Sequence, residues 1–184
     1  MAGALKGIKI LDLTSVGFGP YACQILGDYG AEIILTNAPI ALRMGSIKEL
    51  ADKCNSKIIT ADATSVDDLN NLFSQSIDHF GGKIDFVLHS IGMSVNVRKG
   101  NLYTQQKYDW TIKGLDVSAL SFHKLMQVLY NNDSIEEWGS IVALSYIAAQ
   151  RVFPDYNDMA DNNCLLYTSQ SPRDLSTSRR PSSA

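Results

Sequence analysis

The chain has 184 residues, 45% of them hydrophobic, which is enough for the core of one domain. Its formal net charge is −3 and it has no basic block, which argues against a nucleic-acid-binding surface. The three cysteines are widely spaced and form no metal-binding or CxxC pattern. No apolar run of about twenty residues and no signal-peptide pattern occurs. We therefore expect a cytoplasmic protein with reduced thiols and without a membrane segment.

The first elements predict a β-α-β unit. Residues 7–14 are typical of a buried strand, a helix is expected over 20–30 with Pro20 in its first turn, and residues 32–36 predict a second strand. Gly17 and Gly19 stand at the start of this helix. They either approach a phosphate there or simply form a turn.

The rest of the chain continues the alternation of helix and strand. The apolar run at 84–92 predicts a central strand, and residues 96–100 predict a polar loop. The fold class is therefore α/β, a doubly wound parallel sheet in strand order 3-2-1-4-5. The other predicted elements are helices at 47–54, 65–81 and 108–130, and strands at 57–62 and 139–146.

Two tyrosines follow the last predicted strand. Tyr146 ends the strand, and Tyr156 stands after a loop containing Pro154, where a helix begins. Ligands of open parallel sheets bind beyond the carboxyl ends of the strands, so both phenols are expected to line one crevice. They either donate protons to a carbonyl oxygen that becomes negative, or serve as half-buried amphipathic rings.

Residues 35–161, including the spacing Tyr146-x9-Tyr156, resemble NADH-dependent enoyl-[acyl-carrier-protein] reductase. This family belongs to the short-chain dehydrogenase/reductase superfamily, whose fold is the doubly wound, Rossmann-like sheet. The family pattern continues Tyr-x6-Lys, but this chain has Asn163 in place of the lysine. The resemblance implies a Rossmann-like fold truncated after about five strands.

The resemblance also implies a reaction, in which NADH reduces a trans-2-enoyl thioester carried by acyl carrier protein, in a homo-oligomeric enzyme. Tyr156 would stabilise and protonate the enolate, with Tyr146 assisting at the substrate, whereas His89 would be structural. We expect the chain itself to be inactive, because it lacks the lysine, the original pyrophosphate turn and the later strands. The implied site residues are the catalytic Tyr146 and Tyr156, the cofactor-binding Asp62, Ala63, Ser90, Ile91, Gly92 and Ser145, and the substrate-binding Met93 and Ser94.

The two ends of the chain resemble other sequences. Residues 4–33 resemble the amino terminus of family III CoA-transferases, which predicts a chimera joined near Gly30. Residues 164–184 resemble translated sequencing adaptor, the alternative being a natural disordered tail. We therefore expect one domain over 1–163, with 1–33 foreign, and a disordered, artefactual tail over 164–184. The alternative functions are a CoA-transferase fragment and a non-catalytic nucleotide-binding module.

Overall fold

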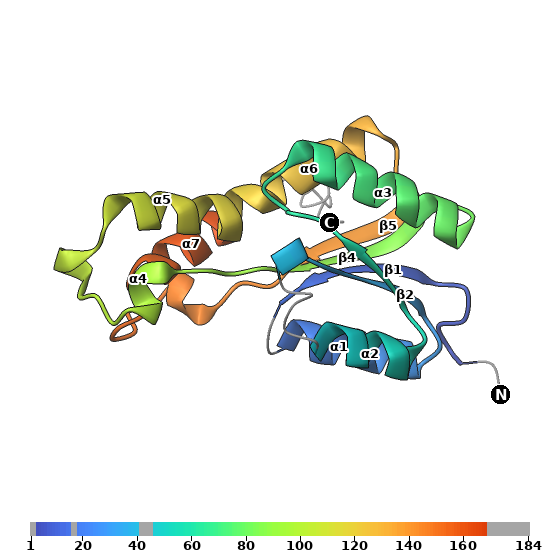
Figure 1. The fold of residues 1–184 in the computed structure, drawn as a ribbon, viewed down its shortest axis with the longest axis horizontal. Helices are drawn as coiled ribbons and strands as arrows, with labels where there is room; N and C mark the ends of the chain where they lie inside the picture. Colours follow the sequence, from blue (N-terminus) through green and yellow to red (C-terminus); the bar gives the residue numbers. More distant parts are fainter. Residues whose placement is uncertain (1–2, 16–17, 41–45, 169–184) are drawn as a thin grey trace, which may run out of the picture.

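The computed structural model describes residues 3–15, 18–40 and 46–168. Within these ranges the chain forms a parallel sheet of five strands in the order β3-β2-β1-β4-β5, which confirms the predicted fold class and strand order. Helices α1 and α2 cover one face of the sheet, and α3 and α6 cover the other (Figure 1). The strands are β1 (Lys9–Thr14), β2 (Glu32–Asn37), β3 (Lys57–Thr60), β4 (Ile84–Ser90) and β5 (Ile135–Ala143).

The core lies on the face of the sheet that α3 and α6 cover. Leu11 of β1 and Val87 of β4 are fully buried there, together with Leu72 and Phe73 of α3 and Leu125 of α6. A hydrophobic residue in such a position stabilises the fold by about 1.5–3 kcal/mol. The α-helices are α1 (Phe18–Asp28), α2 (Ser46–Cys54), α3 (Val66–Phe80), α4 (Val95–Arg98), α5 (Tyr108–Leu115), α6 (Ser121–Asn131) and α7 (Asn157–Thr168).

Local sequence signals fix both ends of α3. The Ser65 side chain caps the amino end by accepting a hydrogen bond from the backbone N–H of Asp68. At the carboxyl end Gly81 has φ 65°, and its N–H donates to the carbonyl of Ile77. Glycine adopts this left-handed conformation without a Cβ penalty, so the predicted end of the helix is confirmed.

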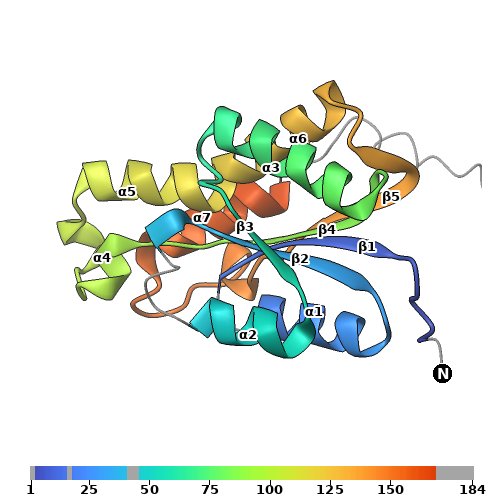
Figure 2. The same ribbon diagram turned by 45° about the vertical axis from the view of Figure 1, so that its right-hand side comes forward.

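The helix predicted over 108–130 is interrupted. Helices α5 and α6 are joined by a π-helical turn, η3 (Asp116–Leu120), so the backbone stays helical but has an extra residue in the turn between them. Helix α5 packs against α4 and α7, whereas α6 packs against α3 and β5. The turn therefore lets one helical segment serve two sets of neighbours (Figure 2).

The prediction that the last strand is buried is wrong. β5 begins four residues earlier than expected, at Ile135, and ends at Ala143, and all its residues are partly or fully exposed. The indole of Trp138 is 93% exposed. The reason is position, because β5 is the last strand in the described sheet order and pairs only with β4.

The polar loop predicted at 96–100 is exposed at its end, over residues 98–100, but its first residues are helical and partly buried. Residues Val95–Arg98 form the short helix α4, capped by Ser94, and Asn96 is fully buried. Its amide donates to Asp158 at 3.0 Å, and its carbonyl oxygen accepts from the backbone N–H of Lys107 at 3.0 Å. A buried amide is tolerated when its donors and acceptors are satisfied in this way.

Helix α7 crosses the expected end of the domain. It continues from Asn157 past residue 163 to Thr168, and Leu166 is buried in the hydrophobic core. Residues 164–168 are therefore helical rather than disordered, and the rest of the proposed tail lies outside the described residues. Among the described residues no helix is long and apolar enough to cross a bilayer.

Gly19 allows α1 to approach the carboxyl ends of β1 and β4. A Cβ at this position would lie 2.6 Å from Cβ of Thr14 and 2.9 Å from Cβ of Ser90, closer than real side chains pack. Its predicted partner in phosphate binding, Gly17, lies outside the described residues. The structure thus gives Gly19 a packing role.

We expect Gly19→Ala to destabilise the fold by about 1–3 kcal/mol, the usual cost of overpacking. Gly27→Ala, in the same helix, is the matched control, because its added Cβ would meet only the flexible end of Ile33 at 3.2 Å. The control should be neutral or stabilising by up to about 1 kcal/mol, since alanine favours helix. Urea unfolding of both variants measures the difference, and equal effects would contradict the close-packing role of Gly19.

Candidate functional site

A shallow cleft of about 80 Å³ lies at the carboxyl ends of the strands. The loops after β1, β2, β3 and β4 all contribute to it, through Thr14, Asn37, Asp62, Ala63 and Ile91 among others. A cavity of about 440 Å³ lies elsewhere, near the start of β2 and beneath α1 and α2. We assign the site to the smaller cleft, because ligands of open parallel sheets bind beyond the carboxyl ends of the strands.

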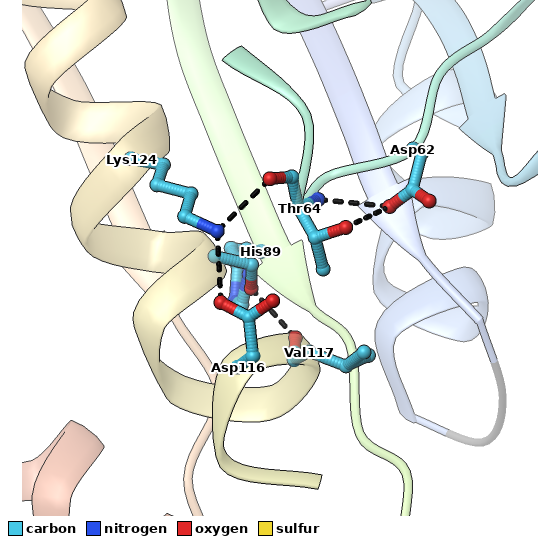
Figure 3. Close-up of polar contacts among 7 residues, drawn as sticks. Asp62, Thr64, His89, Asp116, Val117 and Lys124 are labelled. Carbon is cyan, nitrogen blue, oxygen red and sulfur yellow. Dashed lines mark hydrogen bonds and ion pairs between the residues drawn. The ribbon is translucent and has the colours of Figure 1, made fainter. Parts of the chain in front are cut away.

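The turn that carries Asp62 and Ala63 is held by side chains. Asp62 Oδ1 accepts hydrogen bonds from the backbone N–H of Thr64 at 2.9 Å and from its hydroxyl at 2.7 Å (Figure 3). The backbone N–H of Asp62 donates to Asp68 Oδ2. Asp62 therefore caps this turn, and its exposed side chain also lines the cleft.

A second contact to this turn comes from helix α6. Lys124 of α6 donates to the carbonyl of Thr64 at 2.9 Å and to Asp116 Oδ1 at 2.8 Å (Figure 3). Asp116 begins η3, and the next residue, Val117, lines the cleft. Sequence reasoning missed Lys124 and Thr64, because Thr64 lies sixty residues from the lysine and accepts through its backbone carbonyl.

The end of β4 lies beside the end of β1. The carbonyl of Ser90 accepts from the N–H of Ser15 at 3.2 Å and from its hydroxyl at 3.3 Å. Ile91 follows in the wall of the cleft, and Gly92 is exposed. A Cβ on Gly92 would lie 3.2 Å from the methyl end of Met159 in α7, so this strand end connects the cleft with α7.

The two residues expected at the substrate are tied to neighbouring helices. Met93 N–H donates to the hydroxyl of Ser118 at 2.9 Å, within η3. Ser94 is buried, and its hydroxyl donates to Asp158 Oδ1 at 2.5 Å. Together with Asn96, Ser94 satisfies the buried carboxylate of Asp158, which lies two residues after Tyr156. Sequence reasoning missed this cluster, although Ser94 as a helix cap was a usable signal.

Tyr146 and Tyr156 come together as predicted. Their rings lie 5.1 Å apart and are tilted by 55°, and the ring of Phe153 lies 5.3 Å from Tyr146. Tyr146 is 45% exposed and Tyr156 is partly exposed, so the pair lies at the surface and is not enclosed in the core. Tyr146 directly precedes the short 3₁₀ helix η4 (Ile147–Ala149), and Tyr156 directly precedes α7.

Asn163 occupies the position nearest the Tyr156 hydroxyl on α7. Its amide nitrogen lies 3.5 Å from that hydroxyl oxygen and donates to the carbonyl of Met159 at 2.8 Å. The hydroxyl of Ser145 donates to the Asn163 carbonyl at 3.2 Å. Ser145 and Tyr156 therefore meet at Asn163, and the site holds a neutral amide at this point.

His89 is a structural residue, as the sequence predicted. It is fully buried in β4, and its Nε2 lies 2.9 Å from the hydroxyl of Ser121, which itself donates to the carbonyl of Val117 (Figure 3). Burial lowers the pKa of His89 from 6.5 to about 4. The imidazole is therefore neutral at physiological pH.

This shift predicts a pH dependence of stability. Between pH 6.5 and about 4 the unfolded chain binds a proton at His89 that the folded chain excludes, so the free energy of unfolding falls as the pH falls. The loss from this residue is at most about 3 kcal/mol and is absent above pH 6.5. In urea unfolding at pH 7 and pH 4.5, His89→Gln should show a smaller fall in the free energy of unfolding than the unchanged chain. An equal fall in both proteins would contradict this role of His89.

The site residues thus form two groups on one edge of the sheet. Asp62, Ala63 and Ile91 lie in the cleft, and Ser145, Tyr146 and Tyr156 lie at the end of β5 and the start of α7. The segment 90–94 runs between them.

Comparison with known proteins identifies the family. The family described as enoyl-(acyl carrier protein) reductase matches residues 14–167. The chain is 32% identical over 159 residues to enoyl-[acyl-carrier-protein] reductase [NADH] 1 of Rhizobium meliloti (strain 1021), covering 85% of this chain and 55% of that protein. The chain spans about half the length of the curated reductases it matches.

The solved structure of the FabI–NADH complex from Alistipes finegoldii is 53% identical with a TM-score of 0.84, covering 88% of this chain and 58% of that chain. A short segment has another likeness. It is 58% identical over 36 residues to an acyl-CoA transferase of Fusarium pseudograminearum (strain CS3096), covering 20% of this chain and 8% of that protein. The match of the family over 14–167 extends across most of the sheet and α7. The chain therefore belongs to the enoyl-(acyl carrier protein) reductase family.

Proposed function

We propose that this chain is the dinucleotide-binding and tyrosine-bearing part of an NADH-dependent enoyl-[acyl-carrier-protein] reductase. The observation that carries the proposal is the meeting of Tyr146 and Tyr156, 5.1 Å apart, on the sheet edge that also holds the cleft. A parallel sheet with this arrangement presents a dinucleotide and a proton donor to the same substrate.

The residues of the cleft fit the adenine end of NADH. Its walls include the apolar side chains of Leu13, Ala63, Ile91 and Val117, which suit the faces of a flat base. The buried hydroxyl of Thr36 also lines the cleft and has no hydrogen-bond partner among the described residues. A volume of about 80 Å³ suits one part of a ligand, so the remainder of a dinucleotide would extend along the open edge towards 90–92.

NADH, when bound, supplies the hydride that reduces the double bond of the enoyl thioester. The chain's own contribution is at the thioester oxygen, which becomes an enolate. The Tyr156 hydroxyl donates a hydrogen bond to that oxygen, and Tyr146 orients the acyl group. Met93 and Ser94 border the acyl chain in this proposal, with Ser145, Ser90 and Gly92 at the cofactor.

Asn163 weakens this site relative to the family pattern. A lysine at this position would bring positive charge to the Tyr156 hydroxyl and favour its proton donation, whereas the amide is neutral. The amide is also engaged with the carbonyl of Met159. We therefore infer weak NADH binding and little or no turnover by this chain.

The origin and setting of the chain form part of the proposal. Residues 1–33 derive from a CoA-transferase-like sequence, which the short transferase likeness supports. Residues 164–184 derive from sequencing adaptor. The parent enzyme is a cytoplasmic homo-oligomer whose substrate is an enoyl thioester on acyl carrier protein.

The effect of Asn163 can be measured directly. We expect the chain to bind NADH more weakly than micromolar, and Asn163→Lys to tighten binding by about tenfold or more, because charge-assisted hydrogen bonds contribute roughly 1.5–3 kcal/mol each. Asn163→Gln keeps a neutral amide and is the control that should leave affinity unchanged. Titration calorimetry provides the measurement, and micromolar binding by the unchanged chain would contradict this role of Asn163.

The tyrosines are best tested in a complete enzyme. Residues 35–161 would replace the matching segment of the Alistipes finegoldii reductase, with lysine at position 163, and NADH oxidation would be followed with a crotonyl thioester. Tyr156→Phe removes only the hydroxyl and should lower kcat by roughly 10²–10³-fold, as for loss of one oxyanion donor. Tyr146→Phe should have a milder effect.

The opposite order of effects would reverse the roles of the two tyrosines. Full activity in both variants would show that the pair is structural, and the nucleotide-binding module would then be the better description. Transfer of CoA between acids by the unchanged chain would instead favour the transferase reading.

A further inference from the structure

The wall of the cleft that carries Asp62 and Ala63 lies outside the sheet. β3 ends at Thr60, and the following turn bonds mainly to itself and to the start of α3. Lys124 provides a contact from another layer of the fold, through its bond to the Thr64 carbonyl sixty residues away. This contact ties the turn to helix α6.

Lys124 also bonds to η3. Its ammonium donates to Asp116 Oδ1, and Asp116 adjoins Val117, which also lines the cleft. We call the pair of contacts from Lys124 to Thr64 and to Asp116 the Lys124 bridge. Only 28% of the lysine side chain is exposed, so water screens the bridge less than a fully exposed ion pair.

An ammonium group suits this bridge for a chemical reason. It carries three donors and no acceptor, so it can satisfy a backbone carbonyl and a carboxylate from two different segments at once (Figure 3). Methionine of similar length would fill the space but leave both oxygens without this donor. Lys124 thus connects two segments that line the cleft, although it is not itself a lining residue.

We propose that Lys124 is a positioning residue, whose bridge between Thr64 and η3 sets the spacing of the two cleft walls for the adenine half of the dinucleotide. This inference rests on the proposed function, because it takes the cleft as the adenine site. According to this proposal, the affinity for the cofactor depends in part on a residue of α6 that does not itself line the cleft.

A matched control is available on the opposite edge of the sheet. Lys83, just before β4 begins, forms an ion pair with Asp133 at 2.5 Å. Lys83 is more exposed than Lys124, and Asp133 is more exposed than Asp116. Lys83→Met removes the same chemical group as Lys124→Met, but far along the strand direction from the cleft. Any general effect of losing an ion pair should appear in both variants.

The first experiment titrates the unchanged chain, Lys124→Met, Lys124→Arg and Lys83→Met with ADP-ribose, followed by NMR shifts of cleft amides. We expect Lys124→Met to bind about tenfold more weakly, the effect of losing a charge-assisted contact. Lys83→Met should bind like the unchanged chain. Lys124→Arg should retain affinity within about threefold, because arginine also donates to two acceptors.

The second experiment needs no ligand. Amide hydrogen exchange of Thr64 and Ser65, whose N–H groups bond within the turn, should be faster in Lys124→Met than in Lys83→Met, with the helical amide of Leu69 as internal reference. Unchanged exchange together with unchanged ADP-ribose affinity in Lys124→Met would overturn the inference. No ADP-ribose shift in any variant would overturn the proposed cofactor site itself, whereas the exchange data would still show whether the bridge holds the turn.

Discussion

The pairing of β1 with β4 is the constraint on which the rest of this structure depends. The register runs from Ile10 opposite Phe86 to Thr14 opposite Ser90, and the bond from Ser15 to Ser90 extends it by one residue. Strand order reverses at this pair, so the following segments leave in opposite directions and open the edge of the sheet. The crossing is tight enough that α1 needs Gly19 where it passes the two strand ends.

Polar side chains then position the segments that the sheet leaves free. The buried carboxylate of Asp158 accepts from Ser94 and Asn96 and so fixes the start of α7 against α4, next to Tyr156. His89 and Ser121 connect β4 to the beginning of α6 by a neutral contact. The bonds from Ser94 and Asn96 to Asp158 are buried, so the start of α7 beside Tyr156 is held by the scaffold.

The features that depend on hydrophobic periodicity and on local helix caps could be predicted from the sequence. The strand order, α3 with Ser65 and Gly81 at its ends, and the proximity of Tyr146 and Tyr156 all follow from patterns within a few residues or from the rule for parallel sheets. The predictions that were wrong concern features that depend on residues distant in the sequence. The exposure of β5 follows from its place in the sheet, and the burial of Asn96 follows from a carboxylate 62 residues away. No local pattern records such distant partners.

The π-helical turn η3 also affects how this helix aligns with its relatives. A π turn spans one more residue than an α turn, and each residue advances an α-helix by about 100°. Residues before Asp116 and after Leu120 therefore follow two different helical phases, although the backbone between Tyr108 and Asn131 is continuous. A relative with a straight helix over this stretch would match α5 or α6 without a gap, but not both. Residue-by-residue transfer of roles across η3 therefore requires a one-residue offset wherever a relative lacks the turn.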